Sequence, residues 1–152
     1  MSRPEIRPEI RHAGLIALRQ DGIWRGALIE GPSGVGKSDL ALRALDAGFR
    51  LVADDRVVVF AAGGRLYGKP PKTLAGLIEV RGLGVVDAAA LPFCEVALLI
   101  RCVEDPKAVE RLPDPRSATI TGVSVPVFDL WPREPAAPAK IRRMMQSLGV
   151  AS

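Results

Sequence analysis

The sequence contains few aromatic residues, little histidine or cysteine, and no apolar run long enough to cross a bilayer. Two Trp, one Tyr and four Phe offer little surface for stacking on bases. The basic residues are scattered, so the net charge of +4 does not predict nucleic-acid binding. The start of the chain, MSRPEIRPEIRH, lacks the apolar segment of a secretory signal. We therefore expect a cytoplasmic protein with neither a nucleic-acid nor a membrane partner.

The scarcity of reactive side chains also excludes several kinds of site. Cys94 and Cys102 end the apolar stretch CEVALLIRC, and a strand of that length separates them by roughly 26 Å, out of disulfide reach. We expect two buried, inert thiols. The single histidine, His12, leaves no Cys/His metal-ligand pattern and no basis for a Ser/His/Asp arrangement. Taken alone, a histidine after an N-terminal arm is more typical of a surface residue than of a catalyst.

Length and composition predict one compact domain. With 152 residues, 48% of them hydrophobic, the chain can bury one core and is too short for two ordinary domains. RPEI occurs twice in succession near the start, and its prolines and charges predict an extended or frayed arm over residues 1–11. A single domain over residues 12–152 follows.

The order of apolar runs and turn residues predicts a mixed α/β fold. AGLIAL and IWRGALIE are expected to form a hairpin, because Asp21 and Gly22 between them are a strong turn signal. Residues 37–47 have a helical apolar period that ends before Gly48. Further strands are expected at RLVADD, RVVVF, RLYG, LIEV, CEVALLIRC and VSVPVF, connections at RGLGVVD and EDPKAVERLPDPRSAT, and a terminal helix at AKIRRMMQSLG.

The segment GPSGVGKS matches the phosphate-loop pattern G-x-x-x-x-G-K-[ST] at every fixed position. Its glycines let successive backbone N–H groups point inward, and the following helix adds the positive end of its dipole. Lys37 would reach the β- and γ-phosphates, and the Ser38 hydroxyl would help to hold Mg²⁺. The residues expected to bind a nucleotide are Gly31, Pro32, Ser33, Gly34, Val35, Gly36, Lys37 and Ser38.

Two groups of carboxylates are candidates for chemistry. Asp54 and Asp55 end the strand LVADD, where a P-loop protein places the acid that orients Mg²⁺. On a strand they would point to opposite faces unless the strand has ended and turned, and one of them could instead cap a turn. Glu79 lies in an apolar strand, where Arg81 or a metal could be its partner. Pattern alone does not choose between these alternatives.

In this order and spacing, the motifs resemble the C-terminal kinase domain of bacterial HPr kinase/phosphorylase, in the short form typical of alphaproteobacteria. The likeness is carried by His12, GPSGVGKSDLAL, RLVADD and above all LIEVRGLGVVD, and it extends through ERLPDP and VSVPVF. It implies a P-loop-containing mixed sheet with flanking helices, related to the phosphoenolpyruvate carboxykinase-like P-loop fold.

The resemblance also implies an activity. Members transfer phosphate from ATP, with Mg²⁺, to a serine of HPr, the phosphocarrier of the sugar phosphotransferase system, and many remove it again with inorganic phosphate. Ser38 and Glu79 match the Mg²⁺ ligands. Hexamers are usual in the family, so a homo-oligomer is implied. The catalytic residues implied are Asp55 as proton acceptor, with His12, Lys37 and Arg111.

Two departures from the family pattern limit this expectation. An N-terminal domain of the long form is not found, and the PGRN-type segment associated with phosphate removal is replaced by WPREPAAP. Kinase activity is therefore the better supported half of the reaction pair. The alternatives are a small-molecule kinase and a nucleotide-sensing module that docks a regulator without efficient transfer.

Overall fold

The computed structural model describes residues 7–149. Two α-helices, α1 (Lys37–Asp46) and α2 (Ala137–Gly149), accompany eleven strands within that range. Two short 3-10 helices cover Lys72–Leu74 and Pro106–Ala108. The strands are β1 (Glu9–Arg11), β2 (Ala13–Gln20), β3 (Ile23–Glu30), β4 (Arg50–Ala53), β5 (Val57–Ala62), β6 (Arg65–Lys69), β7 (Leu77–Val80), β8 (Gly84–Asp87), β9 (Cys94–Cys102), β10 (Arg116–Ile120) and β11 (Val123–Leu130).

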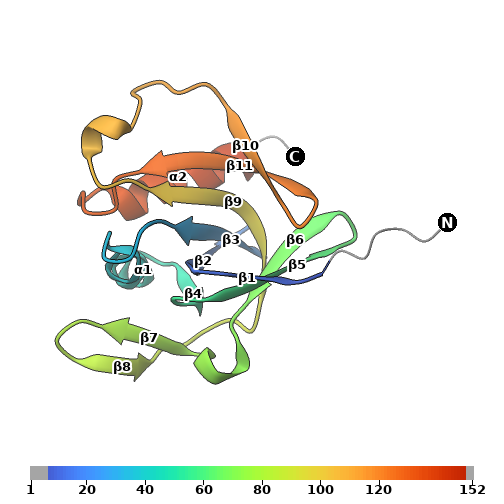
Figure 1. Ribbon diagram of the computed structural model, residues 1–152, viewed down its shortest axis with the longest axis vertical. Helices are drawn as coiled ribbons and strands as arrows, with labels where there is room; N and C mark the ends of the chain where they lie inside the picture. The colour runs from blue at the N-terminus through green and yellow to red at the C-terminus, as the bar shows by residue number, and fades with distance from the viewer. Residues whose placement is uncertain (1–6, 150–152) are drawn as a thin grey trace.

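The main sheet curls until it closes on itself. Its order is β1-β5-β6-β9-β3-β2-β4. In the sequence β1 runs on into β2, and β4 runs on into β5. The pairs β1–β5 and β2–β4 are therefore two halves of one long antiparallel pair, which joins the first strand of the order to the last. Arg11 is opposite Val57 and Leu15 is opposite Ala53, on either side of the two breaks. A second pair, β10 and β11, extends the sheet from β9 (Figure 1).

The central strands β2, β3 and β9 are buried on both faces, which explains their nearly continuous apolar sequences. In β2, Leu15 and Ala17 belong to the core inside the curl, whereas Ile16 and Leu18 belong to the core beneath the helices. This alternation follows from the two-residue period of a strand. The outer core also receives α1 and α2, so both helices cover the outside of the curled sheet.

The mixed α/β architecture expected from the sequence is confirmed. The hairpin β2–β3, helix α1 and strands β4, β5, β6, β9 and β11 lie where the sequence predicts them. Cys94 and Cys102 are free and buried at the two ends of β9, as expected. Within residues 7–149 no helix is both long and apolar enough to span a membrane.

Three short strands fall where the sequence predicts no strand. Residues 9–11, assigned to the arm, form β1 on the edge of β5, while residues 1–6 lie outside the described residues. Residues 116–120 form β10, which turns into β11 through Thr121 and Gly122, both with positive φ. The glycine-rich connection after β7 contains β8, and the two make a separate hairpin that lies away from the main sheet (Figure 1).

The inside of the curl is closely packed around Leu15. A Cβ added to Gly26 of β3 would lie 2.6 Å from Cys94 Sγ, 2.7 Å from Leu15 Cδ1 and 3.3 Å from the Glu95 carbonyl oxygen. Gly14 of β2 is different, because the nearest atom to an added Cβ is the Ala53 carbonyl oxygen at 3.8 Å. Glycine at position 26 is therefore required by space, and glycine at position 14 is not.

Gly26→Ala should lower the free energy of unfolding by about 1–3 kcal/mol, because overfilling a packed core forces its neighbours to move. Gly14→Ala is the matched control and should change it by less than about 0.5 kcal/mol. Urea denaturation followed by circular dichroism measures both. Equal effects of the two substitutions would contradict the close approach at Gly26.

Candidate active site

The phosphate-loop sequence forms a tight loop between β3 and α1. Gly34 and Gly36 adopt positive φ values of 81° and 113°, which L side chains rarely adopt. Gly31 packs against β9, since a Cβ there would lie 2.9 Å from Cys102 Cβ. The Val35 side chain is buried, and its N–H donates to the Pro32 carbonyl at 3.2 Å. The three glycines are thus needed for the path of the loop.

Lys37 is folded back over the loop that precedes it. Its Nζ donates to the carbonyl oxygens of Gly31 at 2.6 Å and Pro32 at 3.0 Å. The ammonium group of this first residue of α1 is therefore held by the first two carbonyl oxygens of the loop. In phosphate loops a lysine at this position of the sequence contacts the terminal phosphates of the nucleotide.

Asp54 is buried directly beneath the start of α1. The residue is 7% exposed, and its carboxylate accepts from Ser38 Oγ at 2.9 Å and from the backbone N–H of Glu79 at 3.1 Å. One side chain thereby joins the loop, the end of β4 and strand β7. Of the two neighbouring aspartates, Asp54 is therefore the one beside the Ser38 hydroxyl.

Asp55 faces solvent instead. Its backbone is left-handed, with φ of 67°, so the strand has ended and turned at this residue. Its side chain is 70% exposed, and Arg56 Nε lies 3.9 Å from Oδ2. The carboxylate is accessible to a second molecule, whereas that of Asp54 is not.

The strand pairing brings His12 next to Asp55. The Ala13 N–H donates to the Asp55 carbonyl at 3.1 Å, which joins the break between β1 and β2 to the break between β4 and β5. His12, the residue just before Ala13, is exposed. The two residues that the sequence separates by more than forty positions thus share one edge of the site.

An ion pair that the sequence did not predict links the edge that carries His12 and Asp55 to the phosphate loop. Arg11 Nε donates to Glu30 Oε1 at 2.6 Å, and Nη2 donates to Oε2 at 3.1 Å. The hydrogen bond to Glu30 raises the pKa of Arg11. Glu30 ends β3 immediately before Gly31 and is opposite Ala13 in the β2–β3 register. This pair therefore connects the strand entering His12 with the strand entering the phosphate loop.

The other two predicted site residues, Glu79 and Arg111, have fewer contacts with the phosphate loop and its neighbouring aspartates. Glu79 is exposed and contacts Asp54 through its backbone N–H, and within residues 7–149 it forms no ion pair with Arg81. Arg111 is exposed in the loop after β9 and lines a cavity of about 1410 Å³ bordered by β11 and α2. That loop leaves β9 at Cys102, next to the residue paired with Glu30, so it starts at the same edge of the sheet as the phosphate loop.

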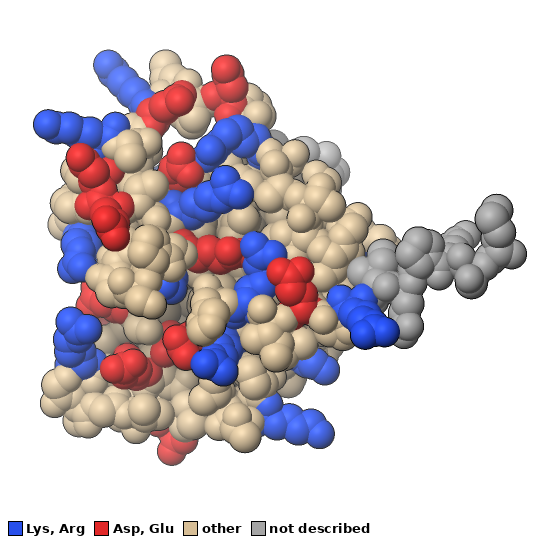
Figure 2. All heavy atoms as spheres, viewed as in Figure 1, with Lys and Arg blue, Asp and Glu red and all other residues tan. Residues whose placement is uncertain are grey.

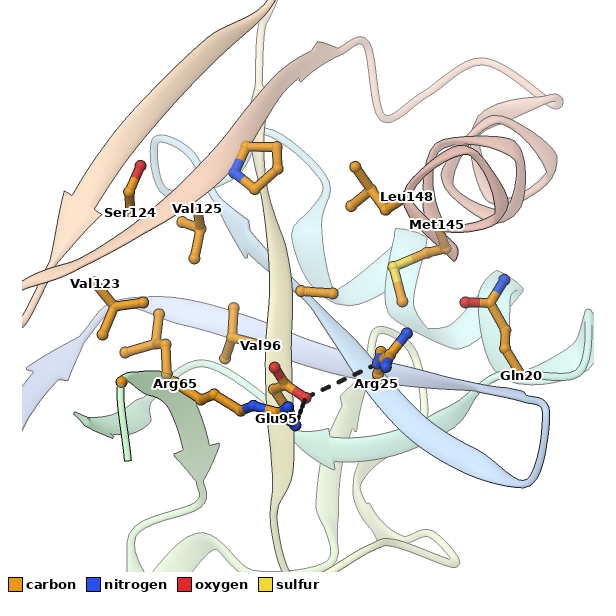
Figure 3. Close-up of a pocket in the computed structure, with 14 residues that line it drawn as sticks. Gln20, Arg25, Arg65, Glu95, Val96, Val123, Ser124, Val125, Met145 and Leu148 are labelled. Atoms are coloured by element: carbon orange, nitrogen blue, oxygen red, sulfur yellow. Dashed lines mark ion pairs between the residues drawn. The ribbon is translucent and has the colours of Figure 1, made fainter. Parts of the chain in front are cut away.

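Charges elsewhere on the surface are mixed. Figure 2 shows Lys and Arg interspersed with Asp and Glu over the visible face. A second cavity, of about 300 Å³, contains Glu95 between Arg25 Nε at 3.8 Å and Arg65 Nη1 at 3.6 Å, with Met145 and Leu148 of α2 on another wall (Figure 3). It lies at the start of β9, at the opposite end of the paired strands β3 and β9 from the phosphate loop.

The buried position of Asp54 predicts a larger role in stability than that of Asp55. Asp54→Ala should lower the free energy of unfolding by about 1–3 kcal/mol, because the Ser38 hydroxyl and the Glu79 N–H lose their acceptor. Asp55→Asn should change it by less than about 0.5 kcal/mol, since asparagine tolerates the left-handed backbone and the side chain is exposed. Urea denaturation of both variants tests this, and a greater loss in Asp55→Asn would contradict the assignment.

The two thiols should be unreactive in the folded protein. Burial raises the pKa of Cys94 to about 12, and it raises the pKa of Cys102 to about 11 although the nearby Lys37 lowers it. At pH 8 the thiolate is then at least about 100-fold scarcer than in an unfolded chain. A thiol-reactive reagent should label the native protein at least about 100-fold more slowly than the urea-unfolded protein. Rapid labelling of the native protein would mean that the ends of β9 are open.

Comparison with known proteins supports the sequence resemblance. The chain is 44% identical over 87 residues to the HPr kinase/phosphorylase of Clostridium beijerinckii, covering 57% of this chain and 28% of that protein. It is 38% identical over 112 residues to that of Streptococcus equi subsp. zooepidemicus, covering 66% and 36%. The chain thus matches about a third or less of the length of these relatives.

A solved structure has the same fold over nearly its whole length. The HPr(Ser) kinase/phosphatase from Coxiella burnetii superposes with a TM-score of 0.79 at 27% identity, covering 94% of this chain and 97% of that one. The sequence model of the family described as HPr serine kinase C-terminal domain matches residues 9–131. The chain therefore belongs to the HPr serine kinase C-terminal domain family.

Proposed function

We propose that this chain is an ATP- and Mg²⁺-dependent kinase that phosphorylates a serine of HPr, the phosphocarrier of the sugar phosphotransferase system. The observation that carries the proposal is the grouping of a phosphate loop, a buried Asp54 on Ser38 and an exposed Asp55 beside His12. The names of the relatives in the curated and structural comparisons supply the protein substrate.

The nucleotide would be held by the loop. Its backbone N–H groups and the positive end of α1 bind the phosphates, and Lys37 leaves the carbonyl oxygens of Gly31 and Pro32 to contact the β- and γ-phosphates. Because Lys37 already lies over the loop, a small movement of the side chain is sufficient.

The residues around Ser38 fit Mg²⁺. The Ser38 hydroxyl and the Asp54 carboxylate beside it are the hard oxygen donors that this ion prefers. The carboxylate of Glu79, whose backbone N–H contacts Asp54, would be a third. The ion normally adds substrate phosphates to one or two protein ligands. Within residues 7–149 no three or more His, Cys, Asp and Glu side chains lie together as a ready-made metal site. When bound, Mg²⁺ would neutralise charge on the phosphates.

Asp55 would accept the proton of the attacking serine. The serine oxygen forms a bond to the γ-phosphorus, the bond to the β-phosphate oxygen breaks, and the serine proton moves to the Asp55 carboxylate, leaving ADP. A base for a protein substrate must be accessible, and the exposed side chain of Asp55 meets that requirement. His12 borders the same space, and Arg111 would approach it from the loop after β9.

Oligomer formation and the removal of phosphate from HPr are supported by fewer observations than the kinase reaction. The homo-oligomer, a hexamer, is implied by resemblance alone. The relatives' names include phosphorylase, but WPREPAAP in this chain does not predict that second activity.

The proposal is tested by intact-protein mass spectrometry of HPr incubated with this protein, ATP and Mg²⁺. HPr should gain the mass of one phosphoryl group, and Asp55→Asn should slow the gain by roughly 10²- to 10⁴-fold while ATP binding is kept, because the variant lacks the base. Asp21→Asn is the matched control, since Asp21 also has a positive φ, 51°, in the hairpin turn between β2 and β3.

Either of two results would overturn the assignment. Absence of a mass gain while ATP binds would favour a nucleotide-sensing module or a different substrate. Loss of ATP binding in Asp55→Asn would mean that Asp55 shapes the loop rather than accepting a proton. Subsequent addition of inorganic phosphate to phosphorylated HPr reports on the reverse reaction in the same sample.

A further inference from the structure

The segment between β11 and α2 lies directly against the phosphate loop and α1. Arg43 of α1 donates to the backbone carbonyl of Glu134 at 3.1 Å and to that of Pro132, and it also pairs with Asp39 at 3.0 Å. Pro132 is buried. The backbone of residues 132–134 is therefore fixed to the first helix, although it is distant from that helix in the sequence.

Arg133 extends from this segment along the loop. Its Nη2 donates to the Gly34 carbonyl at 2.9 Å, a contact across 99 positions of sequence. Its Cγ lies 3.9 Å from the position that a Cβ on Gly36 would occupy, the residue immediately before Lys37. The side chain thus lies along the loop between Gly34 and Gly36, close to the beginning of α1.

In the described part of the chain no ion pair neutralises the charge of Arg133. Within residues 7–149 no carboxylate forms an ion pair with Arg133 or with Lys37, and residues 31–38 contain no acidic side chain. Two cations therefore rest on neutral carbonyl oxygens of one short loop. A guanidinium group has five N–H donors and pairs best with carboxylate or phosphate, so the donors of Arg133 that Gly34 does not use can bind an anion.

We propose that Arg133 is a phosphate-binding residue of this loop and contacts the phosphate chain of the bound nucleotide together with Lys37. The proposal rests on the nucleotide-binding part of the proposed function and not on phosphate transfer to HPr. The family model ends at residue 131, so Arg133 lies beyond it. The segment in which this chain departs from the family pattern, WPREPAAP, thereby becomes part of the nucleotide site.

Calorimetric titration of the full chain with ATP and Mg²⁺ tests the role of the charge. Arg133→Ala should raise the Kd for ATP by about 10- to 100-fold, the range expected for loss of a hydrogen bond to a charged group. Arg133→Gln keeps an N–H donor for the Gly34 carbonyl but lacks the charge, and it should lose as much affinity as Arg133→Ala. Arg133→Lys should lose less.

The salt dependence of the Kd is a second measurement on the same variants. Added salt weakens an exposed charge contact, so the affinity of the native chain should fall more steeply with ionic strength than that of Arg133→Gln. Arg25→Gln is the matched control, because Arg25 pairs with Glu95 at 3.8 Å (Figure 3). Arg25 lies near the start of β3, whereas the phosphate loop follows the end of that strand. This substitution should leave the Kd unchanged.

Several outcomes overturn the inference. Normal ATP affinity in Arg133→Gln with loss in Arg133→Ala would make Arg133 a positioning residue that acts only through Gly34. Normal affinity in both variants would remove it from the site, and no ATP binding by the native chain would remove the site itself. Intact ATP binding that depends on Arg133, without phosphorylation of HPr, would uphold the inference while overturning the proposed function.

Discussion

The hydrogen bond from the Ala13 N–H to the Asp55 carbonyl joins two long strands at the point where both are broken, and the arrangement of the site depends on it. On one side of the breaks β1 pairs with β5, and on the other side β2 pairs with β4. Because the same two strands pair on both sides, the sheet must curl and close. The breaks then place His12 and Asp55 together at one edge, with Asp54 buried between Ser38 and β7.

The features with a strong local signal could be predicted from the sequence. The phosphate loop, the hairpin at Asp21 and Gly22 and the helix after Lys37 each depend on residues within a few positions of one another. The strands β1, β8 and β10 were not predicted because they are short edge or hairpin strands whose stability comes from a partner strand. Their partners could not be inferred from their own sequences.

The roles of Asp54 and Asp55 show the same limit at the site. The sequence places two carboxylates after a strand, but it does not say which of them is buried. In the structure Asp54 is buried under the helix, and Asp55, where the backbone is left-handed, faces solvent. Likewise, the sequence suggested either Arg81 or a metal as a partner for Glu79, because the strand was expected to be apolar and buried. Glu79 is exposed, so burial does not require that it pair with Arg81. The contacts of Arg11 and Arg133 join distant segments, and no local pattern predicts them.

The parallel pairing of β3 with β9 has a consequence for how the protein is made. Gly31 follows β3 but packs on Cys102, the last residue of β9, and its loop is also held by Arg133. A nascent chain therefore exposes the glycine-rich loop long before the segments that support it have left the ribosome. Such non-local pairing is slow to form, so we expect the loop to reach its final shape late in folding. During much of translation, β9 and Arg133 have not yet been synthesised and cannot hold it.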